Sequence, residues 1–146
     1  MKTELQIKQI RTSDPEYPSL LKFRDLWLRK PLGLSLFDES LEGEKNDLIL
    51  IATSQHTIHG CVMLQPKNEQ VIQLRQMAID ADCQGQGEGR KLVTAAENLA
   101  RQHGYQKIIL HARITARKFY ERCGYEAYGE IFTEVTIPHI AMQKQL

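Results

Sequence analysis

The chain has 146 residues, of which 42% are hydrophobic and 25% are charged. This is the balance of an ordinary globular protein, and the length predicts a single domain over residues 1–146. The formal net charge of +1 gives no overall field that would favour nucleic acid or an anionic membrane as a partner. The first residues lack the apolar run of a signal peptide, and no apolar run approaches membrane-spanning length.

The cysteines are few and unevenly spaced: Cys61, Cys83 and Cys123. Their spacing matches no metal site, so no metal is expected. Without an export signal, a reducing cytoplasmic location is the simplest expectation. Cys83 is expected to pack rather than to react.

The first half of the chain predicts a strand, a helix and three further strands. Leu5, Ile7 and Ile10 indicate a short strand, and Asp14-Pro15 opens a helix that Pro31 and Gly33 end. Residues 32–44 are expected to be irregular or weakly helical. Strands are predicted over 48–52, 57–64 and 71–79, and the short turns between them make them antiparallel neighbours.

The second half predicts two helices and three strands. Apolar residues at helical spacing from Leu92 to Ala100 indicate one helix, which ends near Gly104. A strand over 107–112 follows, and the helical crossover makes it parallel to the strand over 71–79. A short helix carries Phe119 and Tyr120, and strands over 125–128 and 134–143 close the chain. The result is an α/β (α+β mixed sheet) fold with helices on both faces of the sheet.

A glycine-rich loop joins the strand that ends at Ile79 to the next helix. Gly85, Gly87 and Gly89 occupy alternate positions there. Glycine lets main-chain N–H groups approach a ligand, and a helix N-terminus favours anions, so the loop predicts a phosphate site. A nucleotide P-loop would end in Gly-Lys-Ser/Thr, whereas Gly89 is followed by Arg90. The glycine spacing also differs from that of the dinucleotide-binding fingerprint.

Two segments resemble one known family. Residues 84–89, QGQGEG, match the Q/R-x-x-G-x-G/A motif of the GCN5-related N-acetyltransferases, the GNAT superfamily. Residues 116–125, ARKFYERCGY, resemble the family's A-x-x-hydrophobic-Tyr-x-x-x-Gly-Tyr/Phe segment. The resemblance covers Leu74 to Tyr125 and implies the GNAT, or acyl-CoA N-acyltransferase, fold. It also implies transfer of the acetyl group of acetyl-CoA, as co-substrate, to a primary amine of a small molecule or peptide.

Other functions remain open at this point. Another acyl-CoA could replace acetyl-CoA, and a non-catalytic acyl-CoA-binding sensor or interaction module is the alternative from a different class. The resemblance makes a homodimer an option, because many GNAT proteins are dimers, although no residue indicates it.

The resemblance also assigns the cofactor-binding residues. Acetyl-CoA would lie between the strands that end at Ile79 and Ala112, with pantetheine pairing with the main chain of residues 77–79. The diphosphate would bind main-chain N–H groups of residues 84–90. The full set is Met77, Ala78, Ile79, Gln84, Gly85, Gln86, Gly87, Glu88, Gly89 and Arg90. Glu88 suits a helix start but would disfavour the diphosphate unless it points to solvent.

Tyr120 matches the family's general acid. A phenol has a reference pKa of about 10 and is therefore protonated at neutral pH. The general base stays open, because the expected inward face of the strand over 71–79 shows Gln73, Arg75 and Met77, none of which is a base. The candidates are His111, Glu134 and His139, and a chain of water molecules would also serve.

The helix after residue 14 is expected to form the wall of the acceptor pocket. Its arginines Arg24 and Arg29 could hold a substrate carboxylate through paired hydrogen bonds. Both are equally well explained as residues of a solvated helix face.

Overall fold

The computed structural model describes residues 4–146 and contains one mixed sheet with strand order β1-β2-β3-β4-β5-β7-β6. Neighbouring strands are antiparallel except β4 and β5, which are parallel. This confirms the mixed sheet and the crossover between its two parallel strands. The strands are β1 (Gln6–Ile10), β2 (Leu48–Ser54), β3 (Thr57–Pro66), β4 (Val71–Ile79), β5 (Lys107–Arg113), β6 (Glu126–Glu134) and β7 (Ile137–Gln145).

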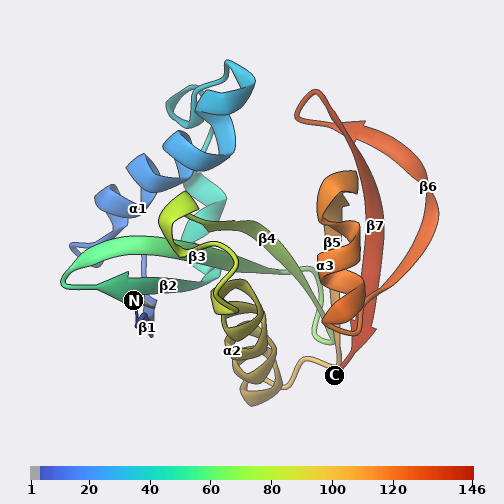
Figure 1. Cartoon of the computed structure of the whole chain (residues 1–146). Coiled ribbons are helices and arrows are strands. Elements are labelled where there is room, and N and C mark those ends of the chain that lie inside the picture. Colours follow the sequence, from blue (N-terminus) through green and yellow to red (C-terminus); the bar gives the residue numbers. More distant parts are fainter. Residues whose placement is uncertain (1–3) are drawn as a thin grey trace.

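Helices cover both faces of the sheet (Figure 1). On one face, α1 (Tyr17–Arg24) continues as a π-helical turn, Asp25–Arg29, and then as a 3-10 turn, Lys30–Leu32. On the other face lie α2 (Glu88–Gln102) and α3 (Arg117–Arg122). Short 3-10 turns also occur at Leu36–Asp38, Glu42–Asn46, Ala81–Cys83 and Ile114–Ala116.

Two apolar clusters hold these layers together, because alternate side chains of a strand point to opposite faces. The cluster under α2 and α3 includes Leu74, Leu92, Leu110 and Tyr120. The cluster under α1 includes Leu20 and Phe23 together with residues of β1, β2 and β3. Among the described helices, none is both long and apolar enough to cross a membrane.

The last hairpin differs from the prediction. Glu134 ends β6 rather than beginning the final strand, which starts at Ile137. The turn consists of Val135 and Thr136, whose φ angles of 50° and 68° lie in the left-handed region. Tight hairpins need this conformation, but they normally place Asn or Gly there, so two β-branched residues did not mark the turn.

A β-bulge in β4 reverses the direction of its side chains. The register shifts between Cys61 and Met63 of β3, and Gln76 has a φ angle of 54°. One extra residue moves every later side chain to the other face. Met77 therefore packs with the α2 cluster, and the prediction that it shares a face with Gln73 and Arg75 is wrong.

Strands β4 and β5 pair over only part of their length. In the described chain the parallel register ends at Leu74 opposite Leu110, although both strands continue. Beyond that point they diverge (Figure 1). The main chain of β4 from Arg75 to Ile79 thus faces a gap instead of a neighbouring strand on its β5 side.

Candidate active site

The glycine loop lies at the open end of β4. Gly85 and Gly87 have φ angles of 77° and 79°, which other residues rarely adopt. Gly89 lies in the first turn of α2, where an added Cβ would be 3.3 Å from the ring of Phe119. Gly85 and Gly87 therefore set the path of the chain, and Gly89 permits close packing of α2 against α3. The resulting run of main-chain N–H groups at a helix start suits a diphosphate.

Side chains beneath the loop hold it in place. The Asp80 carboxylate contacts His59 Nδ1 at 2.6 Å and accepts a hydrogen bond from the main-chain N–H of Cys83 at 3.1 Å. Gln84 Nε2 donates to the carbonyl of Ile79 at 2.8 Å. Burial, and then the hydrogen bond with Asp80, raise the pKa of Cys83 to about 11, so its thiol stays protonated.

His59, Asp80 and Cys83 also form a group that could hold a metal ion, because one ligand atom from each lies within 4.8 Å of the others. The cysteine spacing had predicted no metal site. No spacing along the chain indicates this group, because its three residues come from β3, the end of β4 and the following turn.

Glu88 does not point to solvent. Its side chain is buried and pairs with Lys91 Nζ at 3.3 Å. The condition under which Glu88 would not disfavour a diphosphate, exposure to solvent, is therefore not met, because its side chain is buried in the first turn of α2. Lys91 partly neutralises the Glu88 carboxylate, which weakens the repulsion between this carboxylate and an anion bound at the loop.

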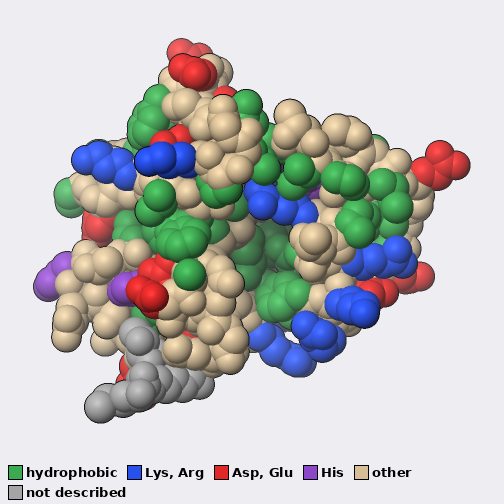
Figure 2. Space-filling model, turned by 45° about the horizontal axis from the view of Figure 1, so that its top comes forward, with side chains coloured by type: hydrophobic (Ala, Val, Ile, Leu, Met, Phe, Trp, Pro, Cys, Tyr) green, Lys and Arg blue, Asp and Glu red, His purple; other side chains and the backbone are tan. Residues whose placement is uncertain are grey.

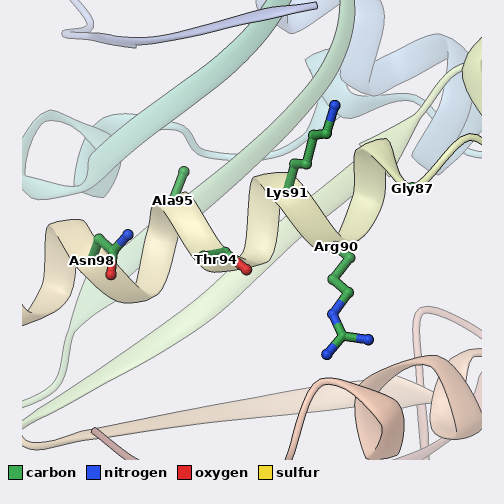
Figure 3. A pocket seen from close by; sticks show the side chains of 6 residues that line it. All are labelled: Gly87, Arg90, Lys91, Thr94, Ala95 and Asn98. Carbon is green, nitrogen blue, oxygen red and sulfur yellow. The ribbon is translucent and has the colours of Figure 1, made fainter. Parts of the chain in front are cut away.

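A surface hollow of about 470 Å³ continues from the loop along α2. It is lined by Gly87, Arg90, Lys91, Thr94, Ala95 and Asn98. Figure 3 shows Arg90 extending from α2 toward α3, while Lys91 points the other way. Two cations thus flank the start of the helix on opposite sides.

A second cavity, of about 410 Å³, lies where β4 and β5 diverge. It is lined by residues of the β4 bulge, the end of β5, the turn after α1, α3 and the β6–β7 hairpin. Figure 2 shows the molecule hollowed near its centre, with hydrophobic side chains on the floor and Lys or Arg side chains at the rim. The unpaired edge of β4 and the residues expected to contact the acceptor therefore line the same cavity.

Tyr120 of α3 lines this cavity. Its ring contacts Phe119 and Tyr125 edge-on, with ring centroids 5.0 and 5.8 Å away. Burial, and secondarily Cys123, raise the pKa of Tyr120 well above its ordinary value, while Arg113 opposes the rise. The phenol therefore stays protonated at neutral pH and above.

The three base candidates lie together on the opposite wall of the same cavity. Glu134 Oε1 is 3.1 Å from His111 Nδ1, and Glu134 Oε2 is 3.8 Å from His139 Nε2. His139 is buried, and its Nδ1 lies 2.9 Å from the carbonyl of Ile137. A carbonyl only accepts, so Nδ1 carries a hydrogen and Nε2 of a neutral His139 holds a lone pair. Phe132 contacts both imidazole rings, at centroid distances of 5.0 and 6.0 Å.

The two arginines predicted at the acceptor pocket lie in different environments. Arg24 is buried and forms two hydrogen bonds of 2.7 Å with Glu44. Glu44 also accepts a hydrogen bond of 2.7 Å from the Tyr17 hydroxyl. Arg24 does not line the cavity, so its assignment to the acceptor pocket is wrong: the guanidinium is directed to Glu44, in the 3-10 turn Glu42–Asn46, instead. Arg29 does line the cavity.

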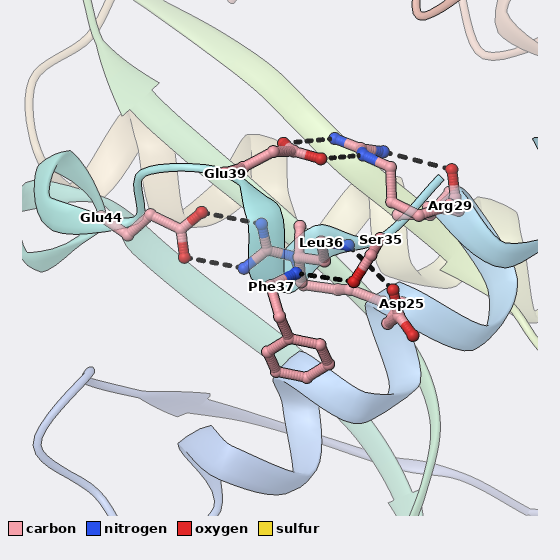
Figure 4. Close-up of polar contacts among 9 residues, drawn as sticks. Asp25, Arg29, Ser35, Leu36, Phe37, Glu39 and Glu44 are labelled. Atoms are coloured by element: carbon pink, nitrogen blue, oxygen red, sulfur yellow. Dashed lines mark hydrogen bonds and ion pairs between the residues drawn. The ribbon is translucent and has the colours of Figure 1, made fainter. Parts of the chain in front are cut away.

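The Arg29 guanidinium already has partners. Nε lies 2.6 Å and Nη2 3.2 Å from the Glu39 carboxylate, and Nη1 donates to the carbonyl of Leu28 at 3.2 Å (Figure 4). Because Glu39 already balances its charge, Arg29 forms part of the pocket wall rather than a free site for a carboxylate.

Comparison with known proteins gives the class to which this architecture belongs. The model of the acetyltransferase (GNAT) domain matches residues 30–146. The chain therefore belongs to the GNAT acetyltransferase family.

Individual relatives agree with this family. An uncharacterised acetyltransferase of Streptococcus pyogenes is 39% identical over 54 residues, and the match spans 37% of each chain. An acyl-CoA N-acyltransferase from Pseudomonas aeruginosa superposes with a TM-score of 0.82 at 21% identity, over 97% of this chain and 99% of the other. A GNAT acetyltransferase from Elizabethkingia anophelis with acetyl-CoA bound superposes with a TM-score of 0.71 at 20% identity, over 99% and 100% of the chains. The latter two share the fold.

Proposed function

We propose that this chain is a single-domain N-acetyltransferase that moves the acetyl group of acetyl-CoA onto a primary amine. The observation that carries the proposal is the cavity between β4 and β5, which has a hydrogen-bond donor on one wall and a group of proton acceptors on the other. Tyr120 comes from the α3 side, and the cluster of His111, Glu134 and His139 comes from the β5–β7 side. A thioester between them would be open to attack by an amine from one direction and to leaving-group stabilisation from the other.

The glycine loop and the open strand edge suit acetyl-CoA. The N–H groups of residues 84–90 would bind the diphosphate, with Arg90 and Lys91 adding positive charge. The main chain of Met77, Ala78 and Ile79 would pair with the amide groups of pantetheine, as an added strand does. The side chains of Met77 and Ile79 pack with the α2 cluster and that of Ala78 with the α1 cluster, so the main-chain edge of this segment is directed at the gap.

The chemical step is direct attack of the neutral amine on the thioester carbonyl. The C–N bond forms, the C–S bond breaks, and the amine loses a proton while the sulfur gains one. Holding both substrates in one cavity makes the attack effectively unimolecular, which supplies much of the rate enhancement.

Tyr120 is proposed to stabilise the departing sulfur by a hydrogen bond from its phenol. The proton that the sulfur finally gains comes from solvent, to which the proton taken from the amine returns. The raised pKa of Tyr120 exceeds that of a free thiol, about 8.5, so a complete proton transfer from Tyr120 to the sulfur is uphill. The phenol therefore acts mainly as a hydrogen-bond donor that stabilises the developing thiolate.

The amine proton is proposed to go to the histidine cluster. His139 is the better placed base, because the carbonyl of Ile137 holds the hydrogen on Nδ1 and leaves Nε2 as an acceptor. Glu134, 3.8 Å from that nitrogen, stabilises the imidazolium that results.

Calorimetric titration with acetyl-CoA, with ATP and NADH as controls, tests the proposal, followed by a free-thiol assay with a panel of small amines and peptides. We expect selective acetyl-CoA binding and thiol release that depends on an amine. Binding without thiol release from any amine would favour a non-catalytic acyl-CoA sensor, and absence of binding would overturn the proposal. Cell fractionation tests the expected cytoplasmic location.

A further inference from the structure

We propose that Arg113 binds a carboxylate of the acceptor, so that the substrate is a small amine that also carries a carboxylate, of the size of an amino acid. The inference rests on the proposed function and assigns the chemistry of its acceptor half. It starts from the charges that line the cavity between β4 and β5: three arginines, Arg29, Arg75 and Arg113, face two glutamates, Glu39 and Glu134.

Two of these arginines are already engaged. Glu39 and a main-chain carbonyl take the guanidinium of Arg29. Arg75 is exposed to solvent, which hydrates its charge, and donates to the side-chain amide oxygen of Gln65 at 3.1 Å. Neither guanidinium therefore needs an anionic ligand to compensate its charge.

Arg113 differs from both. It is half-buried at the end of β5, and among residues 4–146 its side chain makes no hydrogen bond or ion pair. Glu134, the other carboxylate of the cavity, is held between His111 and His139. Burial and the nearby charge of Arg29 lower the pKa of Arg113, which means that the folded protein keeps this cation at a cost. An anionic ligand would remove that cost.

The position of Arg113 explains why the anion belongs to the acceptor. Arg113 and His111 lie two residues apart on β5, so their side chains project from the same face of the sheet. The glycine loop that suits the diphosphate lies across the gap, beyond the end of β4. A carboxylate on Arg113 would place a neighbouring amine beside the histidine cluster.

The size of the cavity favours a small substrate. Its volume of about 410 Å³ must hold the reactive end of acetyl-CoA as well as the acceptor. A planar guanidinium matches a carboxylate through two parallel hydrogen bonds, which would fix the orientation of an amino acid.

The test compares matched pairs of amines that differ only in the carboxylate, namely amino acids and the amines left when the carboxylate is removed. The parent protein and the variants Arg113→Gln and Arg113→Lys are assayed for thiol release. We expect the parent to prefer the amino acids, and Arg113→Gln to lose about 30-fold or more in kcat/KM for them while the decarboxylated amines change little. Arg113→Lys should restore part of the preference.

Arg117→Gln is the matched control. Arg117 is a neighbouring arginine on α3 that lies outside the cavity and pairs with Glu121, so this variant removes the same charge without touching the site. Thermal unfolding is a second readout: we expect Arg113→Gln to unfold at the same or a higher temperature than the parent, because an uncompensated cation is removed. A clear loss of stability would indicate a structural role and overturn the inference.

Four further outcomes would each overturn the inference. Equal loss for both members of each pair, or weaker acetyl-CoA binding by Arg113→Gln, would overturn it by placing Arg113 on the cofactor or on the chemical step. Preference for aminophosphonates over amino acids would overturn the carboxylate and assign a phosphate-type group instead. If no amine releases thiol, binding of the two products is measured instead: an N-acetyl amino acid is titrated by calorimetry into the complex of the protein with CoA. Absence of binding in that titration would overturn the inference. Loss of acetyl-CoA binding itself would instead sink the proposed function.

Discussion

The two halves of the candidate site are built in different ways. The half proposed to bind acetyl-CoA is one continuous segment, from Met77 to Arg90, and it would bind through main-chain groups. The acceptor half draws side chains from the turn after α1, from β5 and from the β6–β7 hairpin. A main-chain site is encoded by local conformation, whereas a side-chain site depends on how distant segments meet. Substitutions in the two halves should therefore have separable effects on binding and on turnover.

The largest effect is expected for Gly87→Asp. The residue has a left-handed φ angle, and the new carboxylate would face the diphosphate, so we expect acetyl-CoA to bind at least about 300-fold more weakly. Calorimetry measures the affinity, and circular dichroism checks that the fold is kept. Gly129→Asp is the matched control, because Gly129 has a φ angle of 77° and lies in β6, outside both cavities. Unchanged affinity in the Gly87 variant would remove the loop from the cofactor site.

The second effect tests the leaving-group side. Tyr120→Phe removes the proposed donor but keeps the ring contacts, so kcat should fall about 100-fold while the acetyl-CoA affinity stays within about twofold. Because burial keeps Tyr120 protonated, the parent should show no loss of activity through this group up to mildly alkaline pH.

Tyr125→Phe is the control for that change. The Tyr125 hydroxyl donates to the buried Glu97 at 2.9 Å, away from the cavity, so its loss should lower stability by about 1 to 2 kcal/mol without slowing turnover. Equal kcat in the Tyr120 variant and the parent would exclude Tyr120 from the mechanism.

A smaller effect is expected for His139→Asn. Loss of the proposed base should lower kcat/KM about 10-fold near neutral pH, and the loss should shrink at higher pH as the free amine deprotonates in solution. A pH–rate profile measures this, with the exposed His103→Asn as a control. The same pH–rate profile on His111→Asn shows which of the two imidazole rings takes the proton. A fall in kcat/KM that does not depend on pH in either variant would indicate that the histidines position other groups instead.

The smallest effect concerns stability near the acceptor half. Burial, and then Glu44, raise the pKa of Asp47 to about 6, and its Oδ1 is buried without a hydrogen-bond partner among the described residues. The folded state thus holds an extra proton between about pH 4 and 6, so this group lowers stability as the pH rises through that range. Asp47→Asn should raise the unfolding free energy by about 1 kcal/mol at pH 7.5 and by little at pH 4, in urea titrations. The exposed Asp38→Asn should show no such trend.

Much of the fold could be predicted because its patterns are local. Alternating and continuous apolar runs marked the strands, and the spacing of Leu92, Ala96 and Leu99 marked α2. The β4 bulge and the Val135–Thr136 turn could not be predicted, because their backbone conformations run against the preferences of their residues. They persist because the pairing of neighbouring strands outweighs the local cost.

The amino-acid sequence by itself determined the glycine loop, its place between a strand and a helix, and the GNAT family, since each depends on residues close together in the chain. Tertiary structure decided the rest of the site. It grouped His111 with Glu134 and His139, buried Arg24 against Glu44, paired Arg29 with Glu39 and left Arg113 without a counter-ion among residues 4–146. Charges on distant segments acquire or lose partners only when packing brings them within a few ångströms, and no spacing along the chain records that distance.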